Sequence, residues 1–96
     1  MKVIPHRNQL MRPTVDAVAS LGGSASVDEI VETVISLLSI PDDLVNRADI
    51  TKRGKEDGRT QLEYELAWAR TVLKQLGVLE NSRRGVWVLT GKEFHD

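Results

Sequence analysis

The sequence contains no cysteine, and this absence excludes several classes of small protein. Without cysteine there is no disulfide framework and no cysteine-ligated zinc site, so packing alone must hold the core. No apolar run approaches the roughly 18 residues of a membrane span. The N-terminal segment lacks the apolar stretch of a secretory signal. We therefore expect a cytoplasmic protein with no membrane partner.

A strong net charge is missing as well. The 13 basic and 14 acidic residues give a formal charge of −1, so the chain as a whole does not attract nucleic acid. Apolar residues make up 41% of the sequence, which is enough for a packed core and too many for a disordered chain. The length of 96 residues predicts one small domain. We place this single domain at residues 10–94, after an N-terminal tail over residues 1–9.

Apolar periodicity and capping signals predict three long helices. The first runs roughly from Met11 to Leu21. The second begins at the capping-box sequence of residues 26–29 and stops at Pro41, which can open a short further helix. The third has the clearest signal: it begins at the capping box of residues 60–63 and ends before Gly77.

Two β-rich runs, Val78–Glu80 and Val86–Leu89, follow the third helix and predict a hairpin. Residues 24–26 are short enough for one extended rung. Residues 46–59 are rich in charge and glycine and are typical of a surface loop. This order predicts a winged helix-turn-helix, mainly α with a small β-hairpin wing. In such folds the last helix enters a DNA major groove, although winged helices also serve as protein-interaction modules.

The third helix is expected to present two different faces. Its apolar stripe falls within an arc of roughly 80° and consists of Leu62, Leu66, Ala69, Leu73 and Leu76. We place Arg70, Thr71 and Lys74 on the opposite, exposed face, with Tyr64 near it. The two tryptophans, Trp68 and Trp87, are expected to pack the wing onto the helix.

Positive charge gathers on the predicted loop, the exposed helix face and the hairpin turn, although residues 27–49 hold six acids against Arg47. A winged helix turns those three elements toward a duplex. Arginine offers bidentate phosphate contact, and a turn before Gly85 does not by itself demand two arginines. The candidate DNA-binding residues are Lys52, Arg53, Lys55, Arg59, Tyr64, Arg70, Thr71, Lys74, Arg83 and Arg84.

The run Leu66–Leu79 resembles the N-terminal domain of Mrr-like restriction endonucleases, and so does Ser82–Thr90. The family has a Trp-Ala-Arg element in its last helix and a wing with an Arg-Gly pair. Here Trp68, Gly77 and Arg84 keep the relative spacing of these elements. One departure is Val78, where the helix exit of the family commonly carries leucine.

The resemblance implies a domain that binds double-stranded DNA and targets a C-terminal nuclease to modified, methylated foreign DNA in a bacterial restriction system. The chain is then a fragment of a longer protein. It needs no cofactor itself, and the Mg²⁺ belongs to the nuclease in the missing domain. The alternatives are a protein-interaction or dimerisation module of a restriction complex, or a small transcriptional regulator. A homo-oligomer through this domain or another domain of the parent stays open.

The catalytic signature of that nuclease can be sought directly in the sequence. Its core is an acidic residue or glutamine, one further residue and then lysine. No lysine of this chain follows an acidic residue or glutamine at that spacing. We therefore expect no catalytic and no metal-binding residues. His6 and His95 lie in the terminal segments without partners at ligand spacing, and we expect them to be solvated tail residues.

Overall fold

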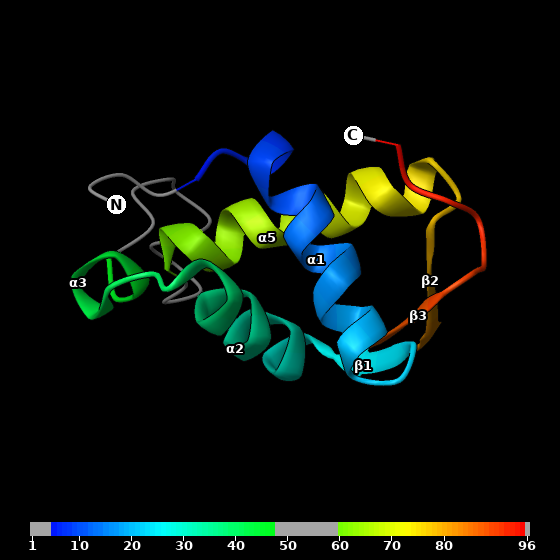
Figure 1. Ribbon diagram of the computed structural model, residues 1–96, viewed down its shortest axis with the longest axis horizontal. Coiled ribbons are helices and arrows are strands. Elements are labelled where there is room, and N and C mark those ends of the chain that lie inside the picture. The colour runs from blue at the N-terminus through cyan, green and yellow to red at the C-terminus, as the bar shows by residue number, and fades with distance from the viewer. Residues whose placement is uncertain (1–4, 48–59, 96) are drawn as a thin grey trace.

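The computed structural model describes residues 5–47 and 60–95, and in them three long helices stand against a small antiparallel sheet (Figure 1). The predicted class, mainly α with a hairpin wing, is confirmed. Figure 1 shows α1 lying across α5, α3 near the start of α5, and the hairpin beginning where α5 ends. The elements are α1 (Arg7–Ser20), β1 (Ser24–Ser26), α2 (Val27–Leu38), α3 (Asp42–Val45), α5 (Gln61–Gln75), β2 (Leu79–Arg83) and β3 (Val86–Leu89).

Reciprocal side-chain caps fix the starts of α2 and α5, and both predicted capping boxes are confirmed. The Ser26 hydroxyl accepts a hydrogen bond of 3.2 Å from the Glu29 amide, and the Glu29 carboxylate accepts one of 2.9 Å from the Ser26 amide. Thr60 and Glu63 make the same pair of bonds at 3.2 and 2.9 Å. Each box satisfies two amides that the first helical turn leaves without partners.

The first helix begins at Arg7, earlier than the predicted Met11. The imidazole Nδ1 of His6 accepts a hydrogen bond of 3.3 Å from the Asn8 amide, and the Gln9 side chain accepts one of 3.0 Å from the His6 amide. The predicted tail therefore ends sooner than expected, and His6 caps a helix. Histidine is not among the usual cap residues, so the sequence signal was easy to miss.

The sheet has the strand order β1-β3-β2, with both pairs antiparallel. The predicted hairpin is confirmed. The extended segment predicted at residues 24–26 is the edge strand β1, in which Ala25 pairs with Trp87. Strand β2 continues to Arg83, so the turn is tighter than expected. Gly85 lies in that turn with a φ of +76°, a conformation that favours glycine. Its carbonyl accepts a 3.0 Å hydrogen bond from the Val27 amide, which ties the hairpin tip to the start of α2.

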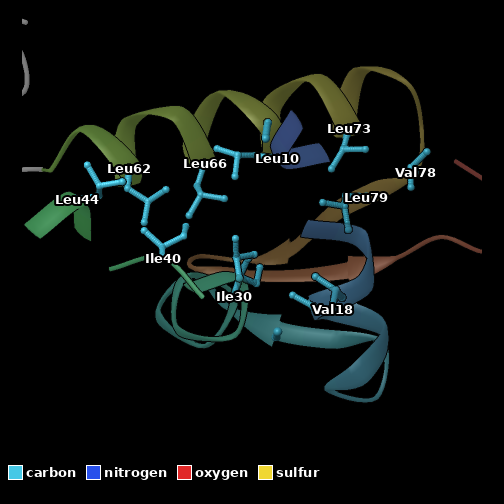
Figure 2. Packing of buried hydrophobic residues seen from close by; sticks show 14 residues of the cluster. Leu10, Val18, Ile30, Ile40, Leu44, Leu62, Leu66, Leu73, Val78 and Leu79 are labelled. Atoms are coloured by element: carbon cyan, nitrogen blue, oxygen red, sulfur yellow. The ribbon is translucent and has the colours of Figure 1, made fainter. Parts of the chain in front are cut away.

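The core lies between α5, α1, α2 and the inner face of the sheet (Figure 2). Figure 2 shows Leu62, Leu66 and Leu73 pointing from α5 toward the other elements. The predicted apolar stripe is confirmed for four of its five members, but Leu76 is 45% exposed. Leu76 ends the helix, where the chain turns away toward β2. Among the described residues, no helix is long and apolar enough to cross a membrane.

Candidate nucleic-acid interface

The outward face of α5 carries the residues that point away from the core. Thr71 and Lys74 are exposed, as predicted, and Tyr64 is half-buried. The Thr71 hydroxyl donates a hydrogen bond of 3.0 Å to the Ala67 carbonyl, one turn back. Its donor is therefore used within the helix, and its methyl group and lone pairs are what it can offer to a ligand.

Trp68 also belongs to this outward face, which corrects the prediction that it packs the wing onto the helix. It is 41% exposed. The guanidinium of Arg7 lies 4.8 Å from the centroid of the Trp68 ring, and the Tyr64 ring meets Trp68 edge-on at 6.5 Å. Arg7 also pairs with Glu65 at 3.3 Å. No local pattern predicts this cluster, because Arg7 comes from α1 and lies 58 residues from its partner Glu65 on α5.

Arg70 lies elsewhere than predicted. Its expected place was the exposed face beside Lys74, but it is only 8% exposed. It occupies the flank of α5 that faces the hairpin, with its guanidinium 5.8 Å from the centroid of the Trp87 ring. This contact confirms that Trp87 packs the wing against the helix. Burial lowers the pKa of Arg70, and the negative charge of Glu63 opposes that shift.

The hairpin turn presents Arg83 and Arg84, both exposed as predicted. Arg83 ends β2 just after an irregularity in its pairing with β3, between Asn81 and Arg83. The Asn81 side chain donates a hydrogen bond of 2.9 Å to the Val86 carbonyl across the hairpin. Short turns and cross-strand hydrogen bonds of this kind hold the backbone of the turn in one conformation. The backbone positions of Arg83 and Arg84 are therefore fixed relative to the hairpin.

The C-terminal segment fixes how the hairpin leaves α5. The Thr90 hydroxyl donates a hydrogen bond of 2.5 Å to the Gly77 carbonyl, and Lys92 Nζ donates one of 2.7 Å to the Leu76 carbonyl. Arg12 Nη2 donates one of 2.6 Å to the Phe94 carbonyl, and its guanidinium lies 4.9 Å from the Phe94 ring centroid. These contacts join residues that are distant in sequence, so no local pattern could have predicted them.

The remaining candidates are the loop cations Lys52, Arg53, Lys55 and Arg59, which lie outside the described residues. Residues 5–47 and 60–95 hold no cluster of three or more histidine, aspartate or glutamate side chains suited to a metal ion.

Three long helices, an edge strand and a hairpin that follows the last helix define a domain of winged-helix type. The family model of the Mrr N-terminal domain matches residues 8–93, so the chain belongs to that family. This membership associates the chain with restriction systems. Neither the curated proteins nor the solved structures include a significant match.

Proposed function

We propose that this domain binds double-stranded DNA through the outward face of α5 and the hairpin turn, without catalysing a reaction itself. The observation that carries the proposal is the pair Arg83 and Arg84, exposed together at the turn of the hairpin that follows α5. Adjacent arginines suit the two uses of a wing, which are contact with phosphates and insertion into a minor groove.

Membership in the Mrr N-terminal family extends the proposal to a biological role. In that role the domain works in the cytoplasm and targets a C-terminal nuclease of a longer protein to modified, methylated foreign DNA. The chemistry of cleavage and its Mg²⁺ then belong to that nuclease. Lys74 and Thr71 on α5 contact the groove or its edges, because they lie on the face turned away from the core.

A second candidate function is contact with a protein, and α2 favours it. Its first turn carries Asp28 and Glu29, and Leu37 near its end is 52% exposed. Leu37 offers an exposed apolar side chain to a partner, and the acidic side chains at the other end of the helix would select a partner of positive charge. A homodimer or a docking partner within a restriction complex would use this surface.

The two functions differ in their dependence on salt. We expect the domain to bind a fluorescein-labelled duplex of about 20 base pairs with an affinity that falls steeply as salt rises, because phosphate contacts release counterions. Replacing Arg83 and Arg84 by alanine should weaken binding to unrelated duplexes alike and flatten the log–log salt slope by about 1.8, at roughly 0.9 per contact. Anisotropy titrations across a salt series measure both quantities.

Glu80→Gln is the matched control, since Glu80 is an exposed residue of the same strand. Removing this negative charge should leave binding unchanged or strengthen it. If the affinity for DNA and the salt slope do not change when both arginines are replaced, the hairpin is not part of the DNA interface. Concentration-dependent dimerisation that Leu37→Ser abolishes would favour the protein-contact function instead.

A further inference from the structure

Arg70 carries a nearly buried positive charge that the described residues do not neutralise. Two of its three guanidinium nitrogens, Nε and Nη1, are buried without a hydrogen-bond partner. Arginine stays protonated under ordinary conditions, so this charge cannot be removed by loss of a proton. A buried, unpaired charge with unsatisfied donors is strongly unfavourable, and native proteins seldom retain one without a function.

The nearest source of compensation is Glu63, two turns back on the same flank of α5, and its carboxylate is already engaged. Glu63 Oε1 accepts hydrogen bonds of 2.9 Å from the Thr60 amide and 3.0 Å from the Thr60 hydroxyl. Its charge acts on Arg70 through space and only partly opposes the lowering of the Arg70 pKa by burial. Among residues 5–47 and 60–95, no carboxylate lies within ion-pair distance of Arg70.

Trp87 holds the guanidinium in place without neutralising it. The 5.8 Å contact with the ring face is a cation–π interaction, which orients the charge and leaves the nitrogens free to donate. Trp87 belongs to β3 and Arg70 to α5, so the charge lies at the junction between the helix and the hairpin. The 8% exposed fraction of Arg70 places it just beneath the surface.

We propose that Arg70 and Trp87 form a binding site for one phosphate group at the junction of α5 and the hairpin. A phosphate oxyanion offers the acceptors that the guanidinium lacks and matches its fork geometry. Because Nε and Nη1 are covered in the free domain, binding requires the Arg70 side chain to rotate outward over the Trp87 ring. The neighbouring exposed cations, Lys74 on α5 and Arg83 on β2, favour a polyanion that runs along both elements. In the proposed function, on which this inference rests, the ligand is therefore a backbone phosphate of the bound DNA. Arg70 then positions the duplex and does not read bases.

This site predicts opposite effects of one substitution on folding and on binding. Arg70→Met keeps an unbranched side chain over Trp87 and removes the charge. Without added phosphate, we expect Arg70→Met to melt at the same temperature as the parent domain or higher, because replacing a buried charge by an apolar group is often neutral or stabilising. The same variant should bind duplex DNA more weakly, with a log–log salt slope smaller by about 0.9.

Inorganic phosphate tests the site without DNA. At constant ionic strength, phosphate in about fivefold excess over its Kd should raise the melting temperature of the parent domain by about 4–8 °C relative to chloride. Arg70→Met should lose this increment. Arg47→Met is the matched control: it removes an exposed cation beside the start of α5, away from the hairpin junction, and should keep the increment.

The outcomes separate the site from the proposed function. A melting temperature that falls in Arg70→Met, together with unchanged DNA binding, would show that Arg70 only supports the packing of the hairpin and would overturn the site. An equal response of both proteins to phosphate would also overturn it. If phosphate stabilises the parent domain through Arg70 but no duplex binds, the anion site stands and the proposed DNA-binding function fails.

Discussion

Lys92 Nζ donates a hydrogen bond of 2.7 Å to the carbonyl oxygen of Leu76, the residue that directly follows α5 as its C-cap. The last carbonyls of a helix lack partners within the helix, and its C-terminus carries partial negative charge. A lysine from the segment after the hairpin therefore caps the helix that precedes the hairpin. This contact ties the segment after the hairpin to the end of α5 and helps to set the direction in which the hairpin leaves α5.

Replacement of Lys92 by methionine should lower the free energy of unfolding by about 0.5–1 kcal/mol, because it removes one charge-assisted hydrogen bond and one favourable dipole interaction. Urea denaturation followed by circular dichroism measures the change. Glu93→Gln is the control, since Glu93 is exposed and its ion-pair partner among the described residues is the exposed His95, at 3.7 Å. Equal stability of the two variants would mean that the bond to Leu76 contributes nothing.

Leu73→Ala and Leu76→Ala should differ strongly, although the sequence places both leucines on one stripe. Leu73 is fully buried, and its truncation should leave a cavity and cost about 2–5 kcal/mol. Leu76 is 45% exposed, and its truncation should cost less than about 1 kcal/mol. Thermal melts of the two single variants are sufficient to test this. Similar losses would mean that the end of α5 is packed more closely than the exposure of Leu76 indicates.

Stability should fall in acid partly through Glu29, whose pKa is lowered by hydrogen bonds from the backbone and then the side chain of Ser26. A carboxyl group with a lowered folded-state pKa stabilises the fold above its unfolded pKa of about 4.3 and loses that contribution as pH falls through the folded value. The parent domain should therefore melt higher than Glu29→Gln at pH 6, and the difference should shrink as the pH falls below the unfolded pKa.

The Ser26→Ala background provides the control for this pH dependence. Without the Ser26 hydroxyl, Glu29→Gln should show a smaller difference in melting temperature at pH 6. A difference between the parent domain and Glu29→Gln that persists unchanged at pH 3 would mean that the carboxylate charge has no part in the effect.

The order of elements could be predicted because local signals determine it. Each signal lies within a few residues of the feature it specifies. The capping boxes at Ser26 and Thr60 specify helix starts, Gly77 specifies the end of α5, and the β-rich run of β3 specifies a strand. The side-chain environments of α5 were harder to predict. Trp68 and Arg70 lie on opposite rims of the apolar arc, and periodicity cannot tell which rim a neighbouring element covers. The hairpin covers Arg70, whereas Trp68 lies against Arg7 at the start of α1 and stays 41% exposed.

The domain should not cleave DNA when incubated with Mg²⁺ or Mn²⁺ and either methylated or unmethylated plasmid. The reason is that no lysine of the sequence follows an acidic residue or glutamine at the spacing of the nuclease signature. Agarose gel electrophoresis detects nicking with high sensitivity. The control is the same preparation with EDTA, and metal-dependent nicking that co-purifies with the 96-residue chain would contradict the prediction.

Trp68→Ala should weaken DNA binding while leaving the fold nearly intact. The indole is 41% exposed on the outward face of α5 and rests against Arg7 and Tyr64, so it is held in place without filling the core. An exposed, ordered tryptophan at an interface commonly contributes more than about 1 kcal/mol, which corresponds to a loss of roughly fivefold or more in affinity. Anisotropy titrations and thermal melts measure the two effects separately.

Fluorescence then locates the contact, because Trp68 and Trp87 are the two tryptophans of the chain. In a Trp87→Phe variant the remaining emission comes from Trp68, and a duplex lying along α5 should quench it or shift its maximum. In a Trp68→Phe variant, emission from Trp87 reports on the hairpin junction instead. Binding that changes Trp87 emission and leaves Trp68 emission and Trp68→Ala affinity unaltered would mean that the duplex contacts the hairpin alone. In that case α5 would serve as its support rather than as the helix in the groove.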